Sequence, residues 1–184
     1  MNSPNVSIQY GESRNRATSA FRIFLAIPHF LVLGAWGSLA QTLGFLQWWF
    51  ILFTGKRNSG LWNMQNSWLG YELRAYGYIC LLFDKWPAFG DLPQGEPTSY
   101  DFLYDQKADR TSSFFRLIML VPALIVFLVL FIASVFVLLA SWFAILFTGK
   151  QPRGCFDFIL KTLRYWLSLE AYGLLMTDAY PKTK

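Results

Sequence analysis

The sequence predicts an all-α integral membrane protein with four membrane helices, built from two tandem parallel repeats that each begin with a short extended segment. Composition is the first observation. Apolar residues make up 54% of the 184 residues, aromatic residues 19% and charged residues 15%, whereas a soluble domain averages ~25% charged. The other two observations are a repeat that covers the chain and a long apolar segment at the same place in each copy.

The chain aligns with itself, without a gap, when it is shifted by the distance between two identical hexapeptides. ILFTGK occurs at 51–56 and again at 145–150. A fixed offset of this kind indicates one structural unit used twice, so we predict repeats over residues 1–94 and 95–184. Further matches at this offset are Tyr10 with Tyr104, Ser19 with Ser113, Arg22 with Arg116, Trp48 with Trp142, Tyr78 with Tyr172 and Asp84 with Asp178.

Each repeat opens on a short stretch of alternating apolar residues, VSIQY at 6–10 and YDFLY at 100–104. Alternation with a period of two is typical of an extended segment with one buried side. The two segments could therefore pair with each other across the duplication.

We predict the first membrane helix of each repeat over residues 19–54 and 113–148. At ~1.5 Å per residue each helix would be about 50 Å long, whereas the hydrocarbon core of a bilayer is ~30 Å thick. Pro28 and Pro122 explain the excess, because proline inside a helix removes a hydrogen bond and kinks it. The part before each proline is then an interfacial lead-in, and a re-entrant hairpin is the alternative. Small residues that let helices approach closely are assigned to packing: Gly34, Gly37 and Gly44.

The hexapeptide marks the end of each of these helices. Gly55 and Gly149 are expected to close them in the left-handed conformation. Lys56 and Lys150 would complement the helix dipole and contact lipid headgroups. A phosphate-binding loop would need an earlier glycine and a Ser or Thr after the lysine, and both copies lack these residues.

We predict second helices over residues 61–83 and 155–177, each with one polar stripe. In the second repeat the stripe holds Asp157, Lys161 and Arg164, spaced like neighbours on one helix face, so that Asp157 and Lys161 can pair. A helix with such a stripe either spans the bilayer with the stripe turned to the bundle interior or lies in the interface. The sequence favours spanning and leaves both arrangements open.

Four spans place both termini on one side of the membrane. The termini and the linker between the repeats carry more Lys and Arg than the two short hairpins do, and positive loops stay in the cytoplasm. We therefore expect a multi-pass protein of the cytoplasmic (inner) membrane with cytoplasmic termini. Two helices per repeat would relate the repeats by an axis along the membrane normal.

The motifs FRIFLAIPHFLVL, WWFILFTGKRNSGLW and AYGYICLLFDKWPAF, with their counterparts in the second copy, resemble an uncharacterised bacterial membrane family, domain of unknown function 4389. The resemblance covers nearly the whole chain and implies a helical membrane fold. It implies no activity, because the family has no established one. The chain departs from the family pattern at Ala123, where His is usual as at His29, and at Asn63, where Asp is usual as at Asp157.

The sequence offers little for catalysis, and we expect a protein that is not an enzyme and holds no cofactor or metal. His29 is the one histidine, so it has no partner at metal-ligand spacing, and motifs such as HExxH and GxSxG are absent. Charges inside membrane helices are costly and usually have a partner or a watery cavity. The candidate residues for binding lipid or a partner are Arg74, Asp157, Lys161, Arg164, Lys56 and Lys150.

These features favour a non-catalytic accessory or structural subunit of a larger bacterial membrane complex, possibly a bioenergetic one. The alternative is a module that binds or transports lipids or small anions, in which the polar stripes of both repeats meet at one pocket. An enzyme acting on a membrane substrate is the weakest hypothesis. The expected partners are membrane lipids and other integral membrane proteins, with no nucleic acid, because the 16 basic residues are spread along the chain.

Overall fold

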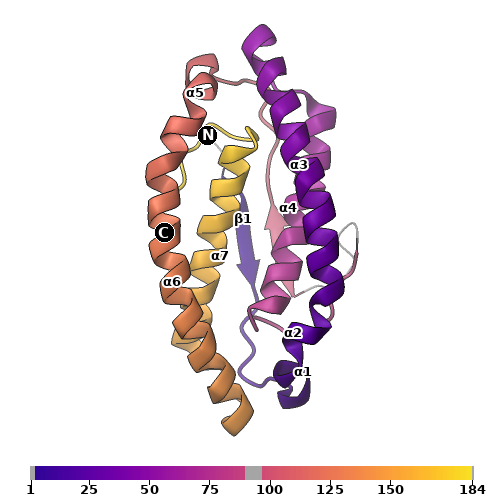
Figure 1. Ribbon diagram of the computed structural model, residues 1–184, viewed down its shortest axis with the longest axis vertical. Helices are drawn as coiled ribbons and strands as arrows, with labels where there is room; N and C mark the ends of the chain where they lie inside the picture. Colours follow the sequence, from indigo (N-terminus) through magenta and orange to yellow (C-terminus); the bar gives the residue numbers. More distant parts are fainter. Residues whose placement is uncertain (1–2, 90–96, 184) are drawn as a thin grey trace.

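The computed structural model describes residues 3–89 and 97–183, so the expected boundary between the repeats at 94/95 lies outside the described residues. Each repeat contains one strand, one or two short helices, a long apolar helix and a second helix (Figure 1). The elements are β1 (Asn5–Ile8), α1 (Arg16–Ala20), α2 (Arg22–Leu25), α3 (Ile27–Thr54), α4 (Ser59–Ile79), β2 (Thr98–Asp101), α5 (Arg110–Phe114), α6 (Arg116–Thr148) and α7 (Arg153–Gly173).

The beginnings and ends of the long apolar helices have local causes. Gly55 and Gly149 follow α3 and α6 with φ of 69° and 73°, a conformation that glycine adopts without steric cost. Pro28 lies in the first turn of α3, after a break at Ala26, where its missing N–H costs nothing. Pro122 lies inside α6, which continues through it.

The second helices end earlier than predicted. They stop at Ile79 and Gly173 rather than near 83 and 177. The chain then turns through Leu81 and Leu175, whose φ angles are 64° and 63°. The backbone bond from Leu82 N to Gly77 O (2.9 Å) closes the first of these ends. The early end frees backbone carbonyls that arginine side chains occupy, as described below.

The prediction that the repeats are parallel is wrong, because the structure places them antiparallel. Trp48, near the end of α3, donates from Nε1 to Ser113 O at the start of the second repeat (3.0 Å). Trp142, near the end of α6, donates in the same way to Ser19 O (3.0 Å). Each long helix therefore ends where the other begins, and an approximate two-fold axis runs across them (Figure 1). An offset in sequence carries no information on the direction of this axis.

The leading segment of each repeat crosses to the other repeat. Ser13 forms a β-bridge with Lys150, and Lys107 forms the equivalent bridge with Lys56. The extended segments also pair, as the alternating residues suggested: β1 and β2 form an antiparallel two-stranded ribbon in which Val6 faces Tyr100. The two repeats are thus joined by exchanged segments.

The helices and the ribbon form three layers, with α4 and α7 in the middle. On α4, the Trp68 ring contacts Trp36 of α3 (6.0 Å between centroids), whereas Asn66 accepts a hydrogen bond from Tyr100 in β2 (2.8 Å). Residues two apart lie on opposite sides of a helix with ~3.6 residues per turn. On α7, the Trp166 ring contacts Phe127 of α6 (4.7 Å between centroids), whereas Arg164 donates a hydrogen bond to Val6 O in the ribbon (2.8 Å). The apolar helices and the ribbon therefore cover opposite sides of the middle layer.

This layering gives the molecule two unlike faces. Most of α6 is exposed, since only 6% of its most apolar 18-residue window is buried, against 28% for α3. Both helices are long and apolar enough to cross a membrane; four membrane spans are not shown. On α4 and α7, both fully described, Met64 is the exposed large apolar side chain. The exposed large apolar side chains of the outer helices include Phe30, Leu31, Phe45, Trp49, Phe53, Leu117, Ile125, Val129, Phe136, Phe143 and Phe147.

Candidate functional site

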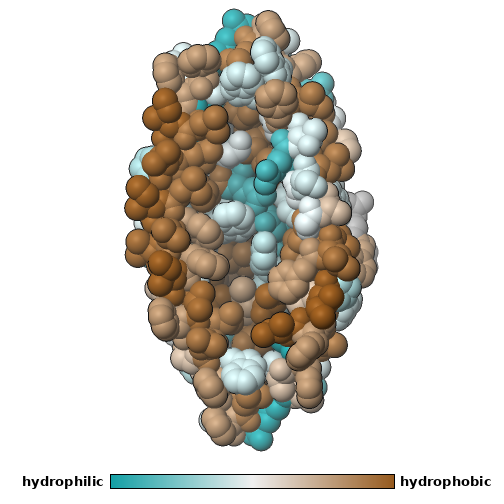
Figure 2. All heavy atoms as spheres, viewed as in Figure 1, coloured by the Kyte–Doolittle hydropathy of each residue, from teal (hydrophilic) through white to brown (hydrophobic). Residues whose placement is uncertain are grey.

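A groove runs between α3 and α6, with the middle layer as its floor. Figure 2 shows this face of the molecule: apolar margins flank a hollow that has hydrophilic residues near its centre. α3 packs on α4 and α6 packs on α7, so the walls come from different repeats. The antiparallel arrangement of the repeats thus creates the groove.

Two cavities follow one another along α6: the larger lies in the groove and contacts α3, whereas the smaller is lined by the end of α4, α6 and α7, and some of their lining positions match at the repeat offset. The larger, of about 470 Å³, is lined by Gly44 of α3, Leu120 and Leu124 of α6, and Glu170 of α7. The smaller, of about 290 Å³, is lined by Leu138, which matches Gly44, and by Tyr76, which matches Glu170. Trp166 lines both. Their walls are mainly apolar, which suits hydrocarbon chains more than a polar metabolite.

Two tryptophan–glutamate hydrogen bonds cross the floor between α4 and α7. Trp68 Nε1 donates to Glu170 Oε1 (3.1 Å), and Trp166 Nε1 donates to Glu72 Oε1 (2.8 Å). Glu72 is buried, whereas Glu170 is partly exposed in the larger cavity. Glu72 and Trp166 occupy the same position in the two repeats, so this bond lies close to the two-fold axis. The floor therefore holds a carboxyl group at the middle of an apolar groove.

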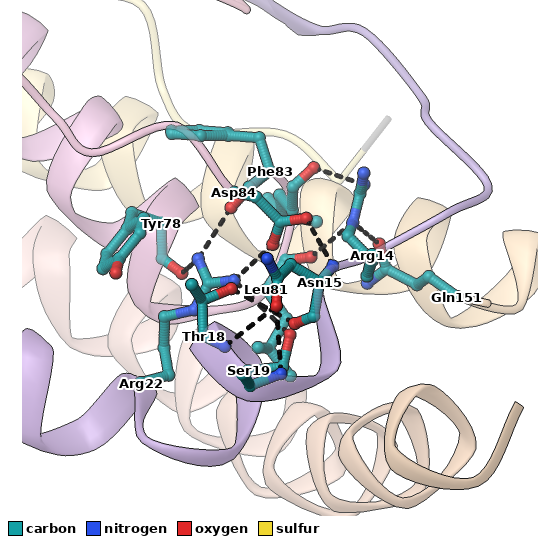
Figure 3. A network of polar contacts seen from close by, with 12 residues as sticks. Arg14, Asn15, Thr18, Ser19, Arg22, Tyr78, Leu81, Phe83, Asp84 and Gln151 are labelled. Carbon is teal, nitrogen blue, oxygen red and sulfur yellow. Dashed lines mark hydrogen bonds and ion pairs between the residues drawn. The ribbon is translucent and has the colours of Figure 1, made fainter. Parts of the chain in front are cut away.

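A polar network closes one end of the molecule (Figure 3). Arg22 is buried and donates to Phe83 O (2.8 Å) and to Asp84 Oδ1 (2.5 Å). Its guanidinium also lies 4.1 Å from the centre of the Tyr78 ring. Asn15 N donates to the other carboxylate oxygen of Asp84 (2.8 Å). Asp84, the residue after the predicted helix end at 83, thus ties the leading segment to the end of α4.

The opposite end has the same network with a second ion pair. Asp178 accepts a hydrogen bond from Arg116 Nη2 (2.7 Å) and forms an ion pair with Arg57 Nη2 (2.6 Å), and both arginine side chains are almost fully buried. Arg57 reaches it from the hairpin of the first repeat. Burial alone would raise the pKa of Asp178, but the hydrogen bond and charge of Arg57, the backbone N–H of Asp109 and the charge of Arg116 outweigh burial and lower it.

The two networks differ in the residue that supplies their second guanidinium group. Arg57 donates from Nε to Leu175 O (2.8 Å). The residue that matches Arg57 in the second repeat is Gln151, and there Arg14 of the leading segment donates to Leu81 O instead (3.2 Å). Arg14 also donates to the Gln151 side chain (3.1 Å). A difference between the repeats in the hairpin is therefore compensated in the segment that meets it.

The family model for a domain of unknown function, DUF4389, matches the chain twice, at residues 16–90 and 110–183. The chain belongs to the DUF4389 family. No curated protein and no solved structure matches it. The matched ranges contain all four long helices and the arginine–aspartate pairs of both end networks, whereas Arg14, Asn15 and Asp109 lie just outside them, and the matched family description carries no activity.

One difference between the two repeats of this DUF4389 chain has a structural explanation. His29 is fully buried, and its Nδ1 lies 2.8 Å from Tyr71 Oη. In the second repeat the matching Tyr165 hydroxyl donates to the backbone carbonyl of Ala123 instead (3.0 Å). Ala123 can therefore stand where the first repeat has histidine, because the tyrosine still has an acceptor.

The polar stripe predicted for the DUF4389 second helices does not meet at one pocket. Asp157, Lys161 and Arg164 are exposed on α7, and Arg164 Nε donates to Val6 O in the ribbon (2.8 Å). Asp157 lies 3.9 Å from Arg153 rather than pairing with Lys161. Arg74 is buried in α4. The stripe is on the ribbon side, away from the groove.

The remaining predicted positions are spread over the molecule. Lys56 and Lys150 are exposed at opposite ends, and Lys150 Nζ lies 2.8 Å from Glu12 Oε1. A Cβ at Gly37 would lie 3.2 Å from Trp68, and one at Gly44 would lie 3.2 Å from Leu174. At Gly34, a Cβ would meet none of the described atoms within 4 Å.

In the described part of the chain, no group of three His, Cys, Asp or Glu residues could hold a metal ion. Cys80 and Cys155 are free thiols. Sequence reasoning missed the groove and the end networks. The signal for the networks was present, because Arg22, Asp84 and their counterparts Arg116 and Asp178 recur at the repeat offset.

Proposed function

We propose that this protein is a non-catalytic membrane module that binds a lipid, with acyl chains in the groove between α3 and α6. The single observation that carries the proposal is a pair of cavities that follow one another along α6, of about 470 and 290 Å³, with mainly apolar walls; the larger opens between the exposed apolar helices α3 and α6. Exposed apolar surface of this extent marks a site of contact with membrane or protein.

The shape of the groove supports a chain-like ligand. The two cavities share Trp166 and continue one another along the long axis. The polar groups on their linings, Gln41, Arg116 and Glu170 among them, are few against the apolar side chains. A few polar groups in a mostly apolar site orient an amphipathic ligand. The stripe of Arg and Lys residues, which the sequence suggested as the lipid site, lies on the other face.

Lipid retention after purification tests the proposal. The full-length protein is extracted in mild detergent and examined intact by native mass spectrometry. The expected result is protein with one or more lipids still bound. Leu124→Trp should fill the larger cavity and reduce retention, because Leu124 lines it. Ile125→Trp is the matched control, since Ile125 is the adjacent residue, is 60% exposed and does not line the larger cavity.

Equal retention by the two tryptophan variants would contradict binding in the groove. Wild-type protein without lipid would contradict lipid binding altogether. Both variants should keep the melting temperature of the wild type, which shows that loss of lipid does not come from misfolding.

A subunit role in a larger complex is the second candidate. The observation that favours it is the exposure of α6 on nearly all sides, including the side away from the groove. In lipid, the hydrophobic effect does not drive helices together, so their packing depends on closely fitting surfaces. A protein that co-purifies in fixed proportion and is released by changes on the outer side of α6 would support this role. For either role, we propose that the protein is located in the cytoplasmic membrane with its termini in the cytoplasm.

A further inference from the structure

The reverse face of the molecule sets a limit on how it can sit in a membrane. The ribbon exposes Asn5, Ser7, Ser99 and Asp101, and beside it α7 exposes its charged stripe at Asp157, Lys161 and Arg164. A two-stranded ribbon also has two open edges. In hydrocarbon, open edges leave backbone groups without partners, and each such group costs several kcal/mol. This face must therefore be in water or covered by protein.

The position of the ribbon argues against a molecule whose helices cross the bilayer. β1 and β2 lie along the same axis as α4 and α7 and cover their middle (Figure 1). If the helices crossed the bilayer, the ribbon and the stripe would lie at hydrocarbon depth. Lys161 is near the midpoint of α7 (Arg153–Gly173), where a charge facing lipid is most costly.

The opposite face fits the interior of one leaflet. α3 has 28 residues and α6 has 33, or about 42 and 50 Å of helix, both longer than the ~30 Å hydrocarbon core. A helix in the membrane plane has no such length limit. Interfacial helices bury an apolar face at the boundary between headgroups and acyl chains, and α3 and α6 expose apolar side chains on either side of the groove.

Basic residues at both ends fit the same placement. Exposed Lys56, Lys107 and Arg110 lie at one end, and exposed Arg16, Lys150 and Arg153 lie at the other. Because the repeats are antiparallel, each end carries at least three exposed cations, so a spanning molecule would have basic residues on both sides of the membrane. In the plane of the membrane, both clusters reach the headgroups of one leaflet, where anionic lipids attract them.

We propose that the protein lies along one leaflet of a bilayer containing anionic lipid, with α3 and α6 in the membrane plane, the groove open to the acyl chains and the ribbon in water. This orientation takes membrane association from the proposed function and adds its geometry. The groove can then receive a chain directly from the leaflet, with no path through water.

Cysteine labelling tests the orientation. Cys80→Ala and Cys155→Ala remove the native thiols, and Lys56→Cys, Lys150→Cys and Lys161→Cys are made singly in the full chain. A membrane-impermeant maleimide is added to spheroplasts and, separately, to inverted membrane vesicles. We expect all three cysteines to react in one of the two preparations, the same one for each, and none of them to react in the other.

Two results would overturn the orientation. A spanning molecule with this fold would react at Lys56→Cys and Lys150→Cys in opposite preparations. In the second result, Lys56→Cys and Lys150→Cys react from one side while Lys161→Cys reacts only after detergent is added. That result would mean that the stripe is buried, either in a bilayer crossed by four spans or under another protein. Labelling in denaturing detergent controls for the presence of each thiol.

The orientation and the proposed function fail in different ways. A protein that retains lipid but labels from opposite sides keeps its lipid-binding role and loses the orientation. A protein absent from the membrane fraction, or one that holds no lipid, loses the proposed function before orientation is measured. Vesicles of phosphatidylcholine with and without phosphatidylglycerol add a last check, because purified protein should bind those with the anionic lipid more tightly and lose this preference in high salt.

Discussion

Removing the Asp178 carboxylate should cost more stability than removing its counterpart in the first repeat, Asp84. Asp178 forms ion pairs with Arg57 and Arg116, whose side chains are 1% and 3% exposed, and is itself 12% exposed. Asp178→Ala would leave two buried cations without a counter-charge. Breaking one buried pair typically costs ~3–5 kcal/mol, so we expect a loss of at least about 3 kcal/mol in the free energy of unfolding.

Asp84 provides the matched control within the same chain. It is 29% exposed and pairs with one arginine, Arg22. The second guanidinium at that end, from Arg14, donates to backbone carbonyls and to Gln151 instead. Asp84→Ala therefore leaves one buried guanidinium group without its carboxylate rather than two, and because Asp84 is the more exposed carboxylate the cost should be no more than about 3 kcal/mol.

Equilibrium unfolding in mixed micelles, followed by tryptophan fluorescence and far-ultraviolet circular dichroism, measures both losses. Asp178→Asn keeps the volume and removes the charge, which separates electrostatics from packing. Equal losses for Asp84→Ala and Asp178→Ala would refute the reasoning. A loss below about 1 kcal/mol at Asp178, typical of a surface pair, would refute it as well.

Three further predictions concern single positions. Gly149→Ala should destabilise the protein by about 1–2 kcal/mol because Gly149 has a positive φ, whereas Gly154→Ala, at an open helical site, should stabilise it by about 0.5–1 kcal/mol; thermal melts of the two variants should shift in opposite directions. Tyr71→Phe removes the partner of buried His29 and should cost about 1–3 kcal/mol, read from the same unfolding curves. Because the pKa of Asp178 is lower in the folded protein than its unfolded value of 3.8, its contribution to the free energy of unfolding is complete above pH 3.8. This contribution is lost as the pH falls through the lower folded-state pKa. In an acid titration, the stability of wild type should fall toward that of Asp178→Asn in this range and remain higher at neutral pH.

Features that depend on a few neighbouring residues were predictable from the sequence. The left-handed glycines at Gly55 and Gly149, the extended segments and the long apolar helices all follow from local chemistry. The alternation at 6–10 and 100–104 led to the ribbon because a half-buried strand needs a partner. The helix ends near Ile79 and Gly173 were placed too late, because leucine in the left-handed conformation at Leu81 and Leu175 leaves no signal in composition.

Features that depend on contacts between the repeats were not predictable. The direction of the two-fold axis is decided by bonds such as Trp48 to Ser113 and Trp142 to Ser19, which join residues 65 and 123 positions apart. The groove follows from that direction, so it was missed together with it. The stripe at Asp157, Lys161 and Arg164 was seen, but its surroundings depend on where the ribbon packs.

The exchange of leading segments makes each half of this chain an unfinished folding unit. The hairpin after α3 gains its edge partner and a counter-charge for Arg57 only from the second repeat, and the hairpin after α6 is completed by residues 12–14. A polypeptide with one repeat could satisfy the same contacts by trading its leading segment with a second copy of itself. The duplicated chain is in this sense a swapped dimer made covalent, in which the linker guarantees the partner at any concentration. The linker also allows the two halves to diverge, as Arg14 and Arg57 have done, since a change on one side can be answered on the other.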